Sequence, residues 1–287
     1  MASATDKITQ SVVSDFQRDG VVLVRQALSQ DWLMLLEMGF KRVMADAGME
    51  KHRHYAGQDG EFLETIRNFD HCLEIKRLLY DSPLADMMAA LIGSENVWYY
   101  ADEFFIKDSS LTGKGCCDRT PWHQDTPYFP VAGSQLASAW ISLDPLPIEE
   151  CLEFVAGSHR GEMFDGFSPA NPNDPSVGYY GEGLPILPDI EADRASFDIR
   201  SWAIEPGDVI FSSPSTIHGG GPTQHAGRRR ALAFRCFGDD VVFASRPPSM
   251  PTVPLTPGLA EHLKPGDPLR SPWYPPLRPV PDTQRYG

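Results

Sequence analysis

The sequence has no long hydrophobic run and no Cys-x-x-Cys motif. No apolar stretch approaches the roughly 20 residues that a transmembrane helix requires, so we expect no membrane-spanning segment. The five cysteines are scattered and form no Cys-x-x-Cys pair, which argues against a zinc site and a disulfide framework. No apolar core follows a basic start near Met1, so we expect no secretory signal. These absences predict a protein of the reducing cytoplasm.

Positive charge is also scarce in this chain. It has 25 lysines and arginines against 39 aspartates and glutamates, which gives a net charge of -14. A strongly negative field repels phosphate, so we expect neither nucleic acid nor an anionic membrane as a partner. The same reasoning disfavours an acyl-CoA substrate, unless Arg228, Arg230 and Arg235 form a local basic patch.

A His-x-Asp motif, His123 and Asp125, lies in the run from Pro121 to Pro127. On a β-strand, residues two apart point to the same face, so this imidazole and carboxylate can reach one metal ion. A second histidine, His218, lies far downstream before three glycines. Two histidines and a carboxylate form the facial triad of non-haem Fe(II) oxygenases, which leaves the opposite face of the metal open. A hydrogen-bonded pair without metal is the simpler alternative.

Residues 228–237 alternate in the manner of a β-strand. Arg229, Ala231, Ala233 and Arg235 share one face of that strand. An arginine followed by small residues suits a face that lines a cavity, where a guanidinium can bind a carboxylate through two hydrogen bonds.

Several short motifs occur in the order, and close to the spacing, of one known family. They are Trp122–Asp125, Tyr128–Pro130, Ala139–Trp140, Leu152–Arg160, Pro206–Asp208, Ile217–Gly219 and Gly227–Ala231. By these motifs, which span most of the chain, the sequence resembles the phytanoyl-CoA dioxygenase (PhyH-like) family of Fe(II)/2-oxoglutarate-dependent oxygenases. It departs from the family pattern at Ala156, where a proline is usual, and at Glu149–Cys151, where Asn-Gly is frequent.

The resemblance implies a fold and a chemistry. The fold is a double-stranded β-helix (jelly-roll, cupin-like) core. Iron is held by His123, Asp125 and His218. The cosubstrates are 2-oxoglutarate, bound at its distal carboxylate by Arg229, and dioxygen, with ascorbate as a reductant. Because related halogenases carry a small residue where Asp125 stands, the carboxylate favours hydroxylation.

Further residues are weaker candidates for the pocket. Trp140, by resemblance, and Glu103 and Lys107, by their place before the metal motif, are expected near the cosubstrate. Side chains expected to shape the substrate cavity are Phe104, Tyr128, Phe167, Tyr180 and Trp202. Arg67 is a further upstream candidate.

The pattern predicts an α+β chain, mainly β, that forms a single domain over residues 1–287. Residues 1–95 form a mostly helical flank, 96–240 the jelly-roll core with a lid insertion at 161–195, and 241–287 a proline-rich arm. We expect helices at 8–18, 30–47 and 83–91, and strands at 20–24, 97–107, 120–125, 137–143, 152–155, 200–204, 209–212 and 230–237.

The leading hypothesis is a dioxygenase that hydroxylates an unactivated C–H bond of a small, largely aliphatic metabolite, of the kind met in secondary metabolism. One alternative keeps this chemistry on an acyl-CoA or carrier-bound acyl group. Others are a zinc or manganese cupin acting as a hydrolase or isomerase, and a catalytically silent binding protein. The sequence leaves monomer and homodimer open.

Overall fold

The computed structural model describes residues 4–54, 61–108, 119–168, 174, 177–223, 227–252, 258–270 and 272–279. Parts of the expected lid at 161–195 and of the arm at 241–287 lie outside these ranges. The helices are α1 (Gln10–Asp19), α2 (Gln30–Ala45), α3 (Asn68–His71), α4 (Leu73–Asp81), α5 (Leu84–Ile92) and α6 (Leu259–His262).

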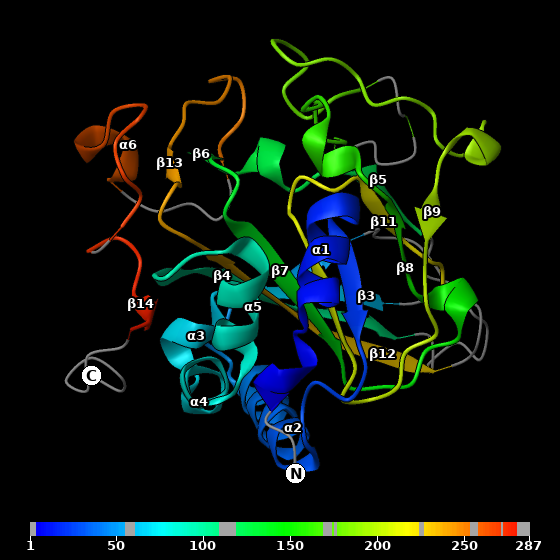
Figure 1. Cartoon of the computed structure of the whole chain (residues 1–287), viewed down its shortest axis with the longest axis vertical. Helices are drawn as coiled ribbons and strands as arrows, with labels where there is room; N and C mark the ends of the chain where they lie inside the picture. Colours follow the sequence, from blue (N-terminus) through cyan, green and yellow to red (C-terminus); the bar gives the residue numbers. More distant parts are fainter. Residues whose placement is uncertain are drawn as a thin grey trace.

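A large antiparallel sheet runs through the molecule (Figure 1). Its strands, in spatial order, are β1 (Val21–Val24), β10 (Val209–Ser212), β7 (Leu136–Ser142), β12 (Arg228–Phe237), β4 (Val97–Asp108), β3 (Glu61–Ile66) and β2 (His52–His54). The C-terminal strand β14 (Pro276–Arg278) also pairs with β4. The late part of the chain therefore returns to the central sheet.

A smaller antiparallel sheet holds the metal motifs. It contains β5 (Thr120–His123), β11 (His218–Gly220), β8 (Leu152–Val155) and β9 (Ile199–Arg200), in that order. Two short strands, β6 (Val131–Ala132) and β13 (Val242–Phe243), form a separate pair.

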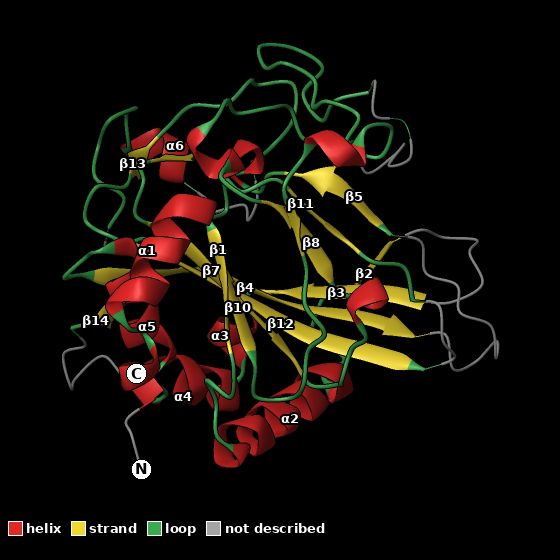
Figure 2. Ribbon diagram, turned by 45° about the vertical axis from the view of Figure 1, so that its right-hand side comes forward, coloured by secondary structure: helices red, strands yellow, loops and turns green. Residues whose placement is uncertain are grey.

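Helices α1 to α5 gather on one face of the large sheet, away from the smaller sheet, whereas α6 lies beside β13 (Figure 2). Leu232 and Phe234 of β12 and Phe104 of β4 are buried there against helix residues such as Leu36 and Phe40. Helix α1 is capped at its start by Thr9, whose side chain accepts a hydrogen bond from the Val12 N–H, and at its end by Gly20, which has a left-handed φ of 75°. Burial of apolar surface stabilises this layer.

The other face of the large sheet packs against the smaller sheet. Ala231 and Ala233 of β12 and Trp140 of β7 share one apolar cluster with Phe154 of β8. Alternation along β12 thus sends even-numbered residues toward the helices and odd-numbered residues toward the space between the sheets.

The mixed helix-and-sheet architecture with antiparallel sheets matches the prediction. Two expected strands are shorter than predicted: β5 ends at His123, not at residue 125, and only Ile199–Arg200 is a strand near 200–204. Helix α4 and strands β3 and β14 were not predicted.

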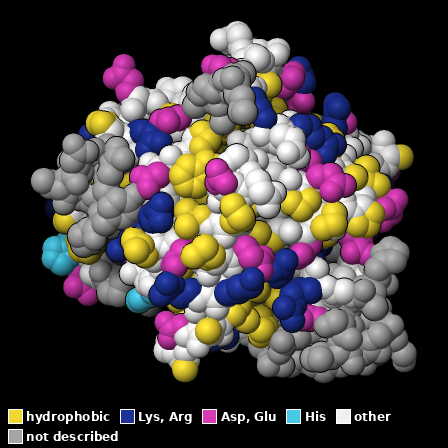
Figure 3. Space-filling model, turned by 90° about the horizontal axis from the view of Figure 1, so that it is seen from below, with side chains coloured by type: hydrophobic (Ala, Val, Ile, Leu, Met, Phe, Trp, Pro, Cys, Tyr) yellow, Lys and Arg dark blue, Asp and Glu magenta, His cyan; other side chains and the backbone are white. Residues whose placement is uncertain are grey.

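In the described part of the chain, no helix is both long and apolar enough to cross a membrane. On the face seen from below, basic and acidic side chains are interspersed and do not separate into patches of one sign (Figure 3).

Candidate active site

His123, Asp125 and His218 come together at the smaller sheet. His123 ends β5 and lies directly opposite His218, the first residue of β11, in the antiparallel register. The Nε2 atoms of the two histidines lie 3.5 and 3.8 Å from Oδ1 of Asp125. One ligand atom from each of the three residues lies within 4.8 Å of the others, a spacing that fits a single metal ion.

Both imidazole rings are oriented by the backbone. Nδ1 of His123 lies 2.8 Å from the Pro121 carbonyl oxygen, and Nδ1 of His218 lies 2.9 Å from the Thr216 carbonyl oxygen. Because a carbonyl accepts only, Nδ1 carries the proton in each ring and Nε2 keeps its lone pair. This pattern is typical of metal-binding histidines, so the donor set fits iron.

Asp125 reaches the site in a different way from the one predicted. The residue lies beyond the end of β5, at φ -78° and ψ -34°, just before a 3-10 turn at Thr126–Tyr128. Its backbone N–H donates to the Pro214 carbonyl at 2.8 Å, in the segment that leads to His218. A turn, not strand alternation, therefore brings the carboxylate beside the histidines.

Burial and neighbouring charges set the ionisation of this cluster. Burial alone would raise the pKa of Asp125, but the Arg235 guanidinium and the two histidines hold that pKa far below its usual range. Burial and the adjacent His123 lower the pKa of His218 to about 4. At neutral pH the site thus offers a carboxylate and a neutral His218 imidazole, the protonation states that metal binding needs.

Gln124, between the two ligands in sequence, points the other way. Its amide Nε2 donates to the carbonyl oxygens of Ser215 and Glu162, at 2.8 and 3.2 Å. Its Oε1 accepts from the Phe164 N–H at 2.9 Å. The middle residue of the motif therefore ties residues 162–164 to the backbone between the two candidate ligands.

Arg235 joins the ligand cluster to the large sheet. Its Nε donates to Oδ2 of Asp125 at 2.9 Å, and its Nη1 donates to Oε2 of Glu103 at 2.6 Å. Burial raises the pKa of Glu103 to about 7, although Arg235 opposes the shift. Arg235 thus bridges Glu103 and Asp125 by hydrogen bonds. The pairing of Arg235 with Asp125 was not predicted, although its alternation with Arg229 had placed it on the inward face.

Arg229 and Lys107 lie opposite each other on β12 and β4. Both side chains are buried, with exposed fractions of 6% and 1%. Arg229 donates from Nη1 to the carbonyl oxygens of Glu150 and Gly221. The Lys107 ammonium lies 5.1 Å from the centre of the Phe62 ring. Two buried cations thus share the inward face, on the same strands as Arg235 and Glu103.

Aromatic rings surround the histidine side of the cluster. The Phe167 ring lies 5.3 Å from His123, and the Tyr128 ring lies 6.3 Å from both. The Tyr128 hydroxyl donates to the Phe167 carbonyl and the Tyr180 hydroxyl to the Pro127 carbonyl. Tyr179 packs edge-on against Tyr128 at 5.0 Å. The hydroxyl groups of Tyr128 and Tyr180 are thus both hydrogen-bonded to backbone carbonyls.

The other predicted pocket residues separate by strand face. Trp140 packs between the sheets, and Trp202 lies beside Phe154, whose ring stacks on His218. Phe104 is a correction, because it is buried on the helix side, 5.5 Å edge-on from Phe40, away from the ligand cluster. Its neighbour Phe105 packs against the cluster between the sheets instead.

Three other arginines take part in ion pairs away from the ligand cluster. Arg67 pairs with Asp70. Arg228 pairs with Asp108 at 2.7 Å, and Arg230 pairs with Asp144 and Glu37. Arg228, Arg230 and Arg235, which the sequence suggested as a basic patch, are thus each paired with a carboxylate.

Comparison with known proteins agrees with these motifs. The family model for phytanoyl-CoA dioxygenase (PhyH) matches residues 16–231. A probable phytanoyl-CoA dioxygenase of Caenorhabditis elegans is 23% identical over 240 residues, covering 79% of this chain and 74% of that protein.

Two solved structures show the same fold. The non-haem α-ketoglutarate-dependent carbocyclase SnoK from nogalamycin biosynthesis superposes with a TM-score of 0.72 at 20% identity, over 96% of this chain and 98% of SnoK. The epimerase SnoN, in complex with Fe3+, α-ketoglutarate and nogalamycin RO, gives 0.71 at 20% identity, over 94% and 98%. With the family model matching most of the sequence, the chain belongs to the phytanoyl-CoA dioxygenase (PhyH) family of Fe(II)/2-oxoglutarate-dependent oxygenases.

Proposed function

We propose that this protein is a dioxygenase that hydroxylates an unactivated C–H bond of a small, largely apolar metabolite. The observation that carries the proposal is the convergence of two histidine Nε2 atoms and one Asp125 oxygen within 4.8 Å. Iron with 2-oxoglutarate and dioxygen supplies an oxidation that is coupled to decarboxylation of 2-oxoglutarate to succinate and carbon dioxide. Ascorbate would serve as the reductant that maintains Fe(II).

The chain's own residues divide the work of binding. His123, Asp125 and His218 would hold iron from one side. Arg229 would bind the distal carboxylate of 2-oxoglutarate, with Lys107 as a second cation beside it and Trp140 on the same inward face. Arg229 and Lys107, two buried cations on adjacent strands, suit a desolvated carboxylate of the cosubstrate.

The surroundings of His123 favour an apolar substrate. Phe167, Tyr128 and Tyr179 present rings there, and the hydroxyls of Tyr128 and Tyr179 donate to backbone carbonyls. These rings would also exclude water from the substrate. SnoN is described in complex with nogalamycin RO, which is consistent with a small-molecule substrate for this fold.

An acyl-CoA or carrier-bound acyl substrate is the second candidate, since the C. elegans relative is a probable phytanoyl-CoA dioxygenase. The contacts of three arginines weigh against it. Arg228, Arg230 and Arg235 all pair with carboxylates, so they offer little uncompensated charge for the phosphates of CoA. A zinc or manganese hydrolase, or a silent binding protein, would have no need of the buried Arg229 and Lys107.

The proposal extends to the architecture and the location of the protein. The two antiparallel sheets would be the two sides of a double-stranded β-helix, with residues 1–287 forming one domain. The segment 161–195 would act as its lid, and the whole would work on a small molecule in the cytoplasm.

Anaerobic titration with Fe(II) and then 2-oxoglutarate tests the proposal. We expect a weak visible charge-transfer band that requires both components, and succinate release once dioxygen and a substrate are present. Iron binding without the band would reject 2-oxoglutarate as the cosubstrate and favour the hydrolase or silent-binder alternatives. Arg200→Gln, which alters an exposed ion pair with Asp198, is a matched control and should leave the band unchanged.

A further inference from the structure

The two carboxylate oxygens of Asp125 have different partners. Oδ1 faces the Nε2 atoms of His123 and His218, at 3.5 and 3.8 Å. Oδ2 accepts a hydrogen bond from Nε of Arg235 at 2.9 Å. The oxygen that turns away from the histidines is thus held by a cation.

Arg235 is itself firmly placed. Its side chain is 8% exposed, and its second donor binds Oε2 of Glu103 at 2.6 Å. The guanidinium also lies 5.5 Å from the centre of the Phe129 ring. Arg235 and Glu103 belong to neighbouring strands of the large sheet, whereas Asp125 lies in a turn. The large sheet therefore positions the guanidinium that holds Oδ2 of Asp125.

From this geometry we propose that Arg235 is a positioning residue, anchored by Glu103, that makes Asp125 a ligand through one oxygen only. The inference rests on the proposed metal site. A carboxylate can bind a metal through one oxygen or through both. Binding through both would fill a position that cosubstrate or dioxygen needs. The charge-assisted hydrogen bond from Arg235 competes for Oδ2 and keeps that position open.

Infrared spectroscopy of the metal-bound protein tests this without turnover. The protein is labelled with carbon-13 at its aspartate carboxyl groups, and difference spectra are recorded as Mn(II) is added without 2-oxoglutarate. The gap between the two carboxylate stretches is wide for one-oxygen ligation and narrow for two-oxygen ligation. We expect a wide gap in the wild type and a narrow gap in Arg235→Gln.

Arg228→Gln is the matched control, because Arg228 lies on the same strand and pairs with Asp108 on β4. It should keep the wide gap. If Arg235→Gln does not fold, the double variant Glu103→Gln/Arg235→Gln replaces it, since it removes both buried charges together. It should also give the narrow gap.

The outcomes separate the two proposals. A narrow gap in the wild type, or a wide gap in the folded Arg235 variant, overturns the role of Arg235 while the metal site stands. Failure of the folded wild type to bind Mn(II) overturns the metal site and this inference together.

Discussion

The two faces of β12 carry arginines with opposite surroundings. Arg228 and Arg230 meet the carboxylates of Asp108 and Asp144, and the Arg228 side chain is 53% exposed. Arg229 and Arg235 point between the sheets, where both are buried. The face with Arg228 and Arg230 thus forms ion pairs outside the ligand cluster. The face with Arg229 and Arg235 places two buried guanidinium groups between the sheets. Neighbouring arginines of one run thus have different surroundings, because successive residues of a strand point to opposite faces.

The largest expected effect comes from removing the carboxylate on the inward side. Asp125→Ala should abolish metal binding and 2-oxoglutarate turnover, because it takes away a ligand and leaves Arg235 paired with Glu103 alone. Calorimetric titration with Mn(II) measures this. Asp108→Ala, the equivalent change at the Arg228 pair, should bind Mn(II) like the wild type. Equal losses in both variants would show that the two faces do not differ as argued.

Arg229→Ala should raise the KM for 2-oxoglutarate about 100-fold, because the distal carboxylate loses a charge-assisted hydrogen bond partner in a buried place. Mn(II) affinity should stay within about twofold of the wild type, since Arg229 contacts none of the three metal ligands in the described structure. Succinate assays at varied 2-oxoglutarate provide the measurement.

Arg228→Ala is the neighbouring control for that experiment. Its KM for 2-oxoglutarate should remain within about twofold of the wild type. A large rise in the KM of Arg228→Ala, with an unchanged KM in Arg229→Ala, would show that Arg228 and not Arg229 binds 2-oxoglutarate.

Leu232→Ala tests the helix-facing side of the same strand. Leu232 is fully buried in the core beneath the helices, so its truncation should lower the free energy of unfolding by about 2–5 kcal/mol. The KM for 2-oxoglutarate of the folded fraction should not change. Urea unfolding gives the first quantity, and a loss below about 1 kcal/mol would contradict the packing described for this face.

Arg228→Gln should have the smallest effect on stability. An ion pair with one half-exposed partner contributes only about 0–1 kcal/mol, and salt screens it. Urea unfolding should therefore give free energies for the variant and the wild type that differ by about 0–1 kcal/mol at low salt and by less at high salt. A loss of several kcal/mol would mean that the pair is a structural support and not a peripheral contact.

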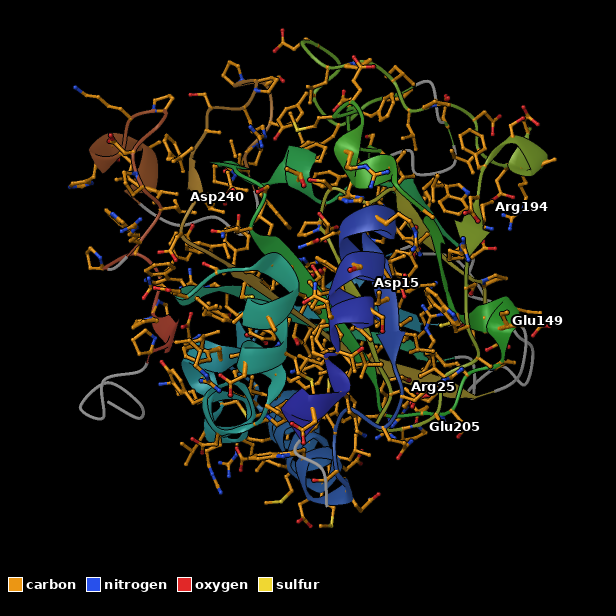
Figure 4. The ribbon with its side chains drawn as sticks, in the orientation of Figure 1. Asp15, Arg25, Glu149, Arg194, Glu205 and Asp240 are labelled. Carbon is orange, nitrogen blue, oxygen red and sulfur yellow. The ribbon has the colours of Figure 1, made fainter. Side chains whose placement is uncertain are left out.

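A second arginine group shows how a carboxylate ties a distant loop to β8, the strand that pairs with β11 in the smaller sheet. Arg194, placed beside β9 in Figure 4, and Arg119 both pair with Glu153 of β8. Burial would raise the pKa of Glu153, but the hydrogen bonds from Arg194 and Arg119 hold that pKa below its ordinary value of 4.5. A depressed folded-state pKa contributes stability above the unfolded value and loses it as the pH falls through the folded value.

Much of the architecture could be predicted because alternation and helical periodicity are local signals. Residues 152–155 and 209–212 are strands over the predicted ranges, and α2 begins at Gln30 as expected. The short strand β14 could not be found, since its pairing with β4 depends on a contact between distant parts of the chain.

The site shows the same limit. The three candidate metal ligands were visible in the sequence as residue types at a characteristic spacing, and the structure brings them together, but Asp125 lies in a turn where strand alternation gives no direction. Phe104 was expected in the pocket together with Glu103 and Lys107, but neighbouring residues of a strand point to opposite faces, and Phe104 pairs with Leu232 on the helix side. The contact of Arg235 with Asp125 joins residues 110 positions apart, and no local pattern encodes it.

The hydrogen bonds of Gln124 link the His-x-Asp motif to a segment outside the ligand cluster. Both neighbours of this residue in the chain are candidate metal ligands, and its side-chain amide is hydrogen-bonded to the backbone of residues 162 and 164. A displacement of residues 162–164 would reach, through the Gln124 side chain, the short stretch of backbone that carries both His123 and Asp125. The spacing of these two side chains would then depend on where residues 162–164 lie.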